Sequence, residues 1–435
     1  MKSEKISIGQ NLKIIRKDLN LRQQDIAGNE VTRNLISLIE NDKTPIYHNV
    51  ANIISNNINK ILGEKNVEIY IEPDDILNPE RYLSRTKANY YIEELENKLK
   101  LKDYNIQDKL LNEIESFLNE WNFIDKKIKI YHLLGDIYHY AGNFEKEYHY
   151  LLKALEVSYE IPNMKNRFRI ALKLIANYIM LKKYREAIRL SNFTLSTEEI
   201  THKRYKGVFY YNNAFAYYHL KDYDNCFREL ENAKPYFTYD SKDMKKVYNL
   251  EGISHDKVGN YDDALASYNK LLEIIGDDPT ELCFAYSNMI QVFISMKDKE
   301  KVNEYYNKIQ DCIPYADPDS YEICSTLFSL GPVYYFFKDY KNCEEVIKKS
   351  IVLSKKHNDP ILVTKNILNI IKLYTETGQI EKIDELVSIY KDELSNLSTD
   401  ENLRIILEII YTYINQGYEL KAKTLIENLL KKEVY

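Results

Sequence analysis

The sequence predicts an all-α protein in which a small helix-turn-helix head precedes a long array of paired helices. Its 435 residues include only 12 glycines and 10 prolines, so turns are sparse and helices should dominate. Apolar residues recur at helical spacing in the first 65 residues. From about residue 89 onward, a second pattern repeats roughly every 40 residues. A chain of this length exceeds one compact core, so several domains or an extended array are expected.

Charge is distributed unevenly along the chain. Residues 1–65 hold 10 Lys and Arg against 7 Asp and Glu, a net charge of +3. The whole chain holds 60 against 66, so the remainder carries 50 against 59, a net charge of −9. The overall net charge of −6 argues against a protein that coats nucleic acid nonspecifically. A basic head on an acidic body is typical of a protein whose head alone contacts phosphate.

Four short helices are predicted in the head, residues 1–65. Apolar residues at 4-3-4 spacing place the first helix at residues 8–19. The second covers residues 22–27 and ends at the stop signal Gly28. The third covers residues 32–40, and a fourth follows. A tight turn between the second and third helices is the helix-turn-helix pattern, which sets one helix in the DNA major groove.

The N-terminal end of the third helix is predicted to face base edges. Arg33 matches guanine O6 and N7, and Asn34 matches adenine N6 and N7. Gln23, Lys43 and Arg16 would hydrogen-bond phosphates and set the register. The full predicted DNA-binding set is Arg16, Gln23, Thr32, Arg33, Asn34, Ser37 and Lys43. The alternative is a plain helical bundle whose polar residues face solvent.

A connection is predicted at residues 66–88. It contains Pro73, Pro79 and a brief alternation of apolar and polar residues. This composition indicates an ordered linker with a short strand or an extended arm, and it lacks the glycine and serine of a free tether.

The repeated pattern over residues 89–435 is that of the tetratricopeptide repeat. Leu134-Gly135 followed by Tyr138 matches its first helix, and Leu330-Gly331 followed by Tyr334 matches it again. The small-residue position recurs at residues 95, 135, 175, 214, 252, 290, 331, 371 and 410. About nine helix pairs are therefore expected. Such pairs stack into a right-handed superhelix whose first helices line the concave surface.

Polar residues on that concave surface are the candidates for binding a peptide. Asn and Gln side chains offer a donor and an acceptor to a peptide backbone, and Lys and Arg suit a carboxylate. The predicted set is Arg169, Tyr211, Asn212, Tyr218, Lys246, Asn249, Asn288, Gln291, Lys365 and Asn369, with Lys372 beside them. The alternative is that these are hydrated residues with no ligand.

Other candidate sites are weaker. His132, Asp136 and His139 share one helix face at metal-ligand spacing, but that face is the ordinary concave one and no HExxH or Cys pair supports a metal. A pH-sensitive patch is an equal alternative. No phosphate loop, nucleophile elbow or paired-carboxylate signature occurs, so we expect neither an enzyme nor a cofactor. Pro332 falls inside a predicted helix, where a kink is expected.

The expected location is the cytoplasm. The N-terminal residues are polar, without the apolar core of a signal peptide, and no apolar run is long enough to span a membrane. Five scattered cysteines without a CxxC pair fit a reducing compartment.

The head resembles the Xre-type, lambda-repressor-like DNA-binding domain. The matching segments are LRQQDIA from Leu21, VTRNLISLIEN from Val31, and the amphipathic helix after Pro45. The turn is one residue shorter than in most of that family. This resemblance covers about 60 residues and implies that the head binds operator DNA.

Head and array together resemble the RRNPP family of Gram-positive regulators. The resemblance implies a cytoplasmic, homodimeric transcription factor that binds a short imported signalling peptide in its array, in quorum sensing and in sporulation or virulence control. It assigns the peptide backbone to Asn212, Asn288 and Asn369, although the repeat boundaries here depart from the family. The alternatives are a response-regulator phosphatase or sequestering scaffold that acts through the repeats, and a DNA-binding protein whose array docks only a protein partner.

Overall fold

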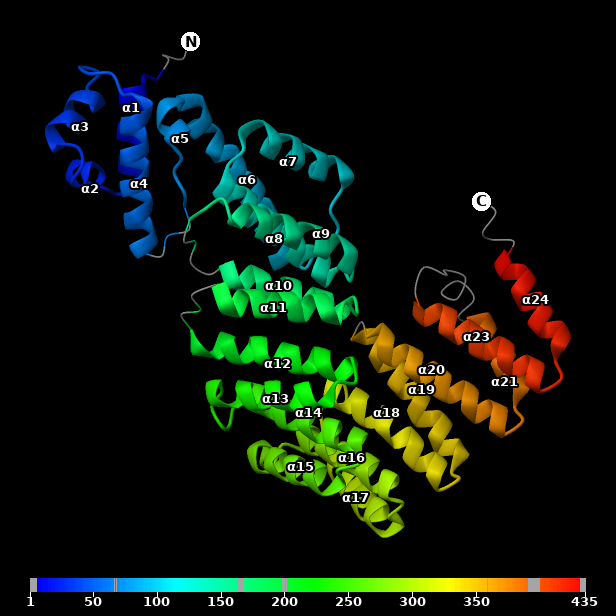
Figure 1. Ribbon diagram of the computed structural model, residues 1–435. Helices are drawn as coiled ribbons and strands as arrows, with labels where there is room; N and C mark the ends of the chain where they lie inside the picture. Colours follow the sequence, from blue (N-terminus) through cyan, green and yellow to red (C-terminus); the bar gives the residue numbers. More distant parts are fainter. Residues whose placement is uncertain are drawn as a thin grey trace. The chain divides into compact units, whose positions relative to one another are not determined.

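A computed structural model shows a chain built of helices (Figure 1). It describes residues 6–65, 67, 69–162, 164, 167–197, 200, 202–357, 359–389 and 400–430. The structure is 81% helical, and none of these residues lies in a strand, which confirms the all-α prediction. The chain divides into two compact units, residues 1–229 and residues 230–435. Among the described residues, no helix is long and apolar enough to cross a membrane.

The first unit begins with the head helices. They are α1 (Ile8–Asp18), α2 (Gln23–Ala27), α3 (Arg33–Glu40), α4 (His48–Glu64) and α5 (Pro73–Leu77). The first three lie where the apolar spacing predicts them. Their fully buried residues form one core with those of α4 and α5: Leu12, Ile15, Ile26, Ile36, Ile54, Ile58 and Ile76.

Glycines and caps hold the head helices at close range. Ser7 caps α1 in a capping box with Gln10. A Cβ on Gly9 would lie 2.0 Å from the Ile39 carbonyl oxygen, so only glycine lets α1 approach α3 this closely. Gly28 adopts φ +61°, as a helix stop requires. The turn that Gly28 begins therefore separates α2 from α3 at the predicted place.

The predicted linker at residues 66–88 is wrong in its conformation. Pro73 begins α5, and Pro79 begins α6 (Pro79–Lys100), so most of the segment is helical. Proline is favoured in the first turn of a helix because the N–H groups there have no partner within the helix, so the N–H that proline lacks costs no hydrogen bond. Both prolines are helix starts, and the first helix of the array extends well ahead of residue 89.

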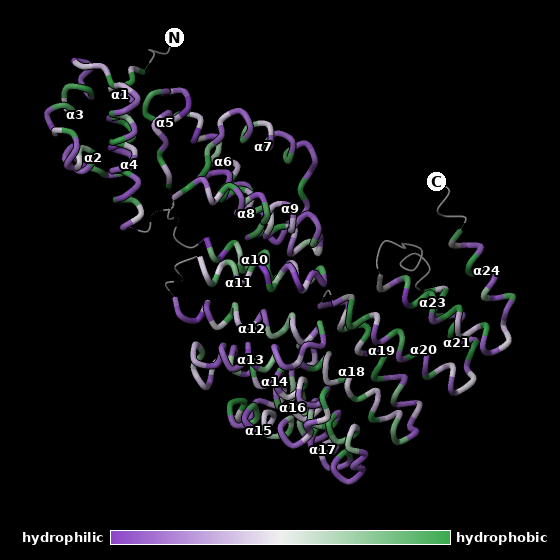
Figure 2. Tube along the Cα trace, in the orientation of Figure 1, coloured by the Kyte–Doolittle hydropathy of each residue, from purple (hydrophilic) through white to green (hydrophobic). Residues whose placement is uncertain are grey.

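The rest of the first unit consists of paired helices. They are α7 (Asp108–Trp121), α8 (Ile124–Tyr140), α9 (Phe144–Ser158), α10 (Arg167–Met180), α11 (Tyr184–Thr197), α12 (Lys203–His219) and, at the boundary between the units, α13 (Tyr223–Ala233). Apolar and polar residues are interleaved along them in Figure 2, as expected for amphipathic helices that each bury one face.

The second unit continues with helix pairs of the same kind. They are α14 (Lys242–Val258), α15 (Tyr261–Ile275), α16 (Pro279–Met296), α17 (Lys299–Cys312), α18 (Tyr321–Phe336), α19 (Tyr340–Lys356), α20 (Pro360–Glu376), α21 (Ile380–Ile389), α23 (Asp400–Asn415) and α24 (Glu419–Leu430). Short 3-10 turns follow α13 at Lys234–Tyr236 and α17 at Ile313–Tyr315. Every predicted small-residue position lies on the first helix of a pair.

Small residues on a first helix meet a large residue on the second helix of the same pair. A Cβ on Gly135 would lie 2.8 Å from Leu151 Cδ2, and one on Gly252 would lie 2.7 Å from Tyr268 Cζ. These distances are shorter than carbon atoms tolerate, so the glycines let the two helices pack closely. At these glycines the sequence pattern is thus a packing requirement within the helix pair.

Tyrosines of the first helices also link neighbouring pairs. Tyr131 donates its hydroxyl to Glu115 Oε2 at 3.3 Å, and Lys153 Nζ lies 2.9 Å from the other oxygen of the same carboxylate. Two further triads have the same arrangement, namely Tyr374 with Glu344 and Lys382, and Tyr413 with Asp384 and Lys421. Some of the abundant tyrosines therefore connect second helices of successive pairs as well as filling the core.

Candidate nucleic-acid interface and ligand-binding face

The N-terminal turn of α3 presents polar side chains to solvent. Arg33 and Asn34 are exposed, whereas Ile36 and Ile39 on the opposite side are buried in the head core. Thr32 is exposed and caps the helix, its hydroxyl oxygen accepting a hydrogen bond from the Leu35 N–H at 3.2 Å. The two side chains predicted to read bases therefore project together from a helix end whose backbone is held by its own cap.

The turn between α2 and α3 is anchored to α4. Asn57 Nδ2 donates to the carbonyl oxygens of Ile26 at 3.2 Å and Ala27 at 3.1 Å. A Cβ on Gly28 would lie 2.5 Å from the same Asn57 amide. These bonds satisfy carbonyls at the end of α2 that have no partner within the helix. The turn thus has one defined geometry, which fixes the direction of α3.

Arg16 and Gln23 have an internal role that the sequence analysis did not assign. Arg16 donates through Nε to Glu40 Oε1 at 2.5 Å and through Nη2 to Oε2 at 2.9 Å. Its Nη1 also donates to the Leu21 carbonyl oxygen at 3.0 Å. Gln23 Nε2 donates to Glu40 Oε2 at 2.9 Å. These donors are engaged within the head, so phosphate contact by either side chain stays a prediction for their remaining groups.

Glu40 of α3 is the residue that joins α3 to α1, through Arg16, and to α2, through Gln23. Its side chain is only 2% exposed at the end of α3. Burial alone would raise the pKa of Glu40, but hydrogen bonds from Arg16 and Gln23 bring that pKa below its usual value. Sequence reasoning assigned Glu40 only as a helix end. The sequence did contain a signal for this role, because the helical pattern places the Glu40 carboxylate beside the buried apolar stripe of α3.

Two further predicted DNA contacts lie around α3. Ser37 is half-buried on the helix, and Lys43 is exposed just beyond it. The Lys43 N–H donates to the Leu38 carbonyl oxygen at 2.9 Å. Asp42 adopts φ +57° and accepts a hydrogen bond from the Ser7 hydroxyl at 2.7 Å. The loop that carries Lys43 is therefore ordered against the start of α1.

In the first unit, the predicted ligand-binding residues lie on α10 and α12, which contact each other. Arg169 is exposed, and its guanidinium carbon lies 5.5 Å from the centre of the Tyr205 ring. Tyr211, Asn212 and Tyr218 are half-buried on α12. Neither helix contains an acidic residue, while together they carry Arg167, Arg169, Lys173, Lys203, Arg204 and Lys206. Arg167 is buried against the Ser158 carbonyl oxygen and Lys173 pairs with Asp136 of α8, so the exposed positive charge lies on Arg169, Lys203 and Arg204.

In the second unit, two predicted asparagines pair with each other. Asn288 Nδ2 on α16 donates to Asn249 Oδ1 on α14 at 2.8 Å. Each amide still has its other polar atom, which a peptide backbone can use. Lys246 and Lys365 are exposed, Asn369 is half-buried, and Lys372 lies 5.4 Å from the Tyr335 ring centre.

The side-chain amide of Gln291 is bonded to the backbone of α18. Its Nε2 donates to the Ser329 carbonyl oxygen at 3.0 Å. Pro332 lies inside α18 and cannot donate to Phe328, the residue one turn earlier. Gln291 thus bonds the carbonyl next to that of Phe328, in the same turn of α18. Its assignment to peptide binding is the least supported of the set.

The histidines and carboxylate that shared metal-ligand spacing have separate partners. Asp136 pairs with Lys173 at 2.5 Å, and His139 Nδ1 lies 3.1 Å from Glu147 Oε1. The bond to Glu147 raises the pKa of His139, whereas burial lowers the pKa of His132 to about 4. Across the described ranges, no group of three potential metal ligands comes together.

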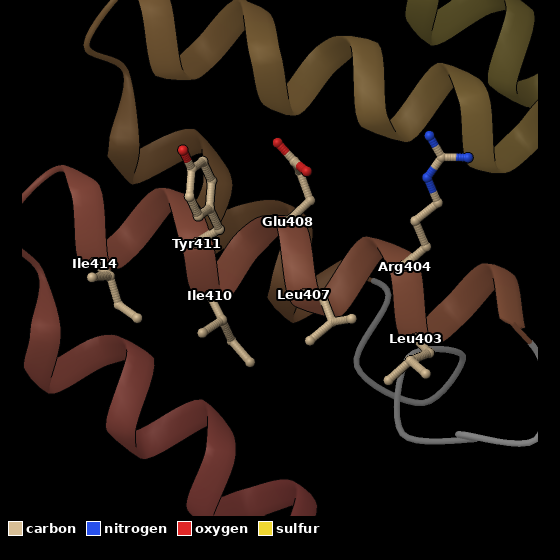
Figure 3. A pocket seen from close by; sticks show the side chains of 7 residues that line it. All are labelled: Leu403, Arg404, Leu407, Glu408, Ile410, Tyr411 and Ile414. Atoms are coloured by element: carbon tan, nitrogen blue, oxygen red, sulfur yellow. The ribbon is translucent and has the colours of Figure 1, made fainter.

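An apolar surface on α23 was not anticipated from the sequence. Figure 3 shows Leu403, Leu407, Ile410 and Ile414 pointing to one side of the helix, with Arg404, Glu408 and Tyr411 on another. Leu407, Tyr411 and Ile414 are all more than half exposed.

Comparison with known proteins leaves the family open. No protein-family model matches the chain, and no curated protein matches it. A tetratricopeptide repeat protein from Parabacteroides merdae shares 13% identity over 65% of this chain and 99% of its own, with a TM-score of 0.49. A Rap protein complexed with Competence and Sporulation Factor shares 14% identity over 80% and 97%, with a TM-score of 0.45. Bacillus thuringiensis PlcR in complex with the peptide PapR7 and DNA shares 16% identity over 62% and 95%, with a TM-score of 0.34. At such TM-scores the similarities establish neither a family nor a function for this chain.

Proposed function

We propose that the chain is a transcriptional regulator that binds operator DNA through its head. The observation that carries the proposal is the exposed pair Arg33 and Asn34 at the capped start of α3. Arg and Asn are the residue types that pair bidentately with guanine and adenine in the major groove. The anchored turn before α3 supports the proposal because a reading helix must be held in a defined direction. One head reads only a half-site, so we propose a homodimer on a two-fold operator.

We further propose that the repeats bind a short signalling peptide, which controls the head. The exposed basic side chains of α10 and α12 suit a peptide carboxylate, and the paired amides of Asn249 and Asn288 suit a peptide backbone. Asn212 and Asn369 are the further backbone candidates. Because binding at two sites is linked, the peptide must change DNA affinity by the same factor by which DNA changes peptide affinity.

This organisation resembles the DNA-binding members of the RRNPP regulators of Gram-positive bacteria, and we propose that the chain acts like them, in the cytoplasm and as a DNA-binding protein instead of an enzyme. Among them we propose the clostridial sporulation and virulence regulator RstA as a similar protein. Control of sporulation or virulence by quorum sensing follows from that resemblance.

The DNA-binding proposal is tested by selecting an operator from random duplexes and measuring its affinity. Arg33→Ala should cost about 1–3 kcal/mol of binding free energy and relax the preference for guanine at one position. Lys60→Ala removes the same charge from an exposed position on α4 and is the matched control. Equal affinities for the wild type, Arg33→Ala and Asn34→Ala proteins would contradict a reading role for α3.

The same variants separate the alternatives. A response-regulator phosphatase or a sequestering scaffold acts through its repeats, so Arg33→Ala with Asn34→Ala should leave its regulatory activity in cells intact. A regulator acting at DNA should lose it. Mass spectrometry of the purified protein then tests for a bound oligopeptide. Recovery of a protein partner without any peptide would favour an array that docks proteins only.

A further inference from the structure

A buried ionic cluster lies where the head meets the first repeats, within the first unit. Its centre is Asp75 on α5, a carboxylate with no exposed surface. Arg81 Nε on α6 donates to one of its oxygens at 2.9 Å, and Arg85 Nη2 donates to the other at 2.7 Å. Arg81 and Arg85 are themselves 9% and 6% exposed. Charged groups are rarely buried to this extent unless their partners are precisely arranged.

The two guanidinium groups extend the cluster to the following helices. Arg85 Nη1 donates to Asp125 of α8, at 2.8 Å to Oδ1 and 2.9 Å to Oδ2. Arg81 Nη2 donates to Glu72 Oε2 at 2.7 Å, and its Nη1 donates to the Trp121 carbonyl oxygen at the end of α7. Planar forks of this kind form two bonds at fixed angles, which a lysine cannot reproduce.

The Phe123 ring fills the space between the cluster and the array. The guanidinium carbons of Arg81 and Arg85 lie 4.8 Å and 5.0 Å from its centre. Phe123 is completely buried, and Trp121 stacks on it with ring centres 6.2 Å apart. The cation–π contacts stabilise both guanidinium groups against a surface that belongs to the first helix pairs.

The same α5 segment is bonded to the head on its other side. Asn11 of α1 is 1% exposed and donates through Nδ2 to the carbonyl oxygens of Asp75 at 2.8 Å and Ile76 at 2.9 Å. The Tyr82 hydroxyl of α6 donates to Asp18 Oδ2 of α1 at 3.0 Å. One short segment therefore has its backbone held by α1 and its side chain held by α6 and, through Arg85, by α8.

We propose that Glu72, Asp75, Arg81, Arg85 and Asp125 form a rigid joint that makes the head move as one body with α6 and α8. If the head were joined to the repeats by a flexible tether, its orientation would not depend on theirs. Here any reorientation of α8 against α6 must either carry the head along or separate buried opposite charges, which is costly. The five residues are positioning residues, because they act by fixing the orientation of the head and not by contact with a ligand. The joint is independent of the proposed function, because its rigidity needs neither DNA nor peptide.

The test is amide hydrogen exchange by mass spectrometry on the full-length protein without DNA or peptide. Arg85→Lys keeps the charge but loses the fork between Asp75 and Asp125. We expect exchange in α1 and α3 to rise by about tenfold together with that in α6 and α8, although no residue of the head core has changed. The emission of Trp121, the single tryptophan, should shift in the same variant.

Two further variants complete the experiment. Tyr82→Phe removes only the hydroxyl that bonds Asp18, leaves the buried charges untouched, and should raise exchange in α1 by about twofold. Lys153→Gln breaks the ion pair with Glu115 further along the array and is the control, with a rise confined to α7 and α9. A rise confined to α6 and α8 in Arg85→Lys, with α1 and α3 unchanged, would overturn the proposal. If Arg85→Lys does not fold, Asp125→Asn removes the charge that Arg85 Nη1 binds on α8, and unchanged exchange in α1 and α3 of that variant overturns the proposal.

Discussion

Replacing Glu40 by alanine should loosen the whole head, although Glu40 belongs to none of its apolar core. In the structure one carboxylate accepts two bonds from Arg16 and one from Gln23, and so connects α1, α2 and α3. Without it, Arg16, whose side chain is only 14% exposed in the structure, would lose its anionic partner. The change therefore removes three bonds and also leaves a nearly buried charge unpaired.

The magnitude follows from these contacts. Breaking a buried ion pair by removing one partner costs about 3–5 kcal/mol. Arg16 retains its bond to the Leu21 carbonyl oxygen and some contact with water, so the lower value, about 3 kcal/mol, applies here. That free energy corresponds to an increase of roughly 150-fold in the exchange of amides that open with the head.

Hydrogen exchange is the appropriate assay because a chain of two units need not unfold in one transition. Exchange should rise in α1, α2 and α3, while that in α14–α20 stays unchanged. Glu64→Ala, which removes an exposed carboxylate at the end of α4, is the control and should change little. Head exchange in Glu40→Ala within threefold of the wild type would refute the reasoning, since about 0.6 kcal/mol is too small for a buried pair.

The remaining predictions concern pH, packing and DNA. The pKa of Glu40 in the folded state lies below its unfolded value, which is near 4.3. The carboxylate therefore contributes its full stabilisation of the head above that pH, and this stabilisation is lost as the pH falls through the folded-state pKa. Hydrogen exchange should show a smaller acid-induced loss of head stability in Glu40→Gln than in the wild type. Gly252→Ala should cost about 1–3 kcal/mol, because the new Cβ would meet the buried Tyr268 ring, whereas Gly331→Ala, with its nearest atom at 3.2 Å, should be nearly neutral in thermal unfolding. Lys43→Ala should weaken binding equally to all operator variants and lower the salt dependence of binding by about one phosphate contact; a loss limited to one base position would instead assign Lys43 to base reading.

Local patterns were sufficient for the helices of the head and for the register of the array. The 4-3-4 apolar spacing places α1, and Gly28 marks the end of α2, because helix periodicity and helix stops depend on neighbouring residues only. The linker prediction was wrong for a related reason. Pro73 and Pro79 favoured an ordered linker with a short strand or an extended arm, but proline is also common at the first position of a helix.

For the candidate sites too, some features follow from the local sequence and others depend on the tertiary structure. The sequence by itself determined which residue types stand at the start of α3, since a cap at Thr32 and the turn before it are local features. It also indicated the spacing of the repeats, because Gly135, Gly252 and Gly331 each face a side chain of the same helix pair. The tertiary structure alone decided that Arg16 and Gln23 bind Glu40, that Gln291 binds the Ser329 carbonyl oxygen, and that Arg85 joins Asp75 to Asp125. Those partners stand far apart in the chain, 24 residues for Arg16 and Glu40 and 40 for Arg85 and Asp125. No local pattern specifies such pairs, because the choice of partner for a buried charge depends on which helices the apolar core brings together.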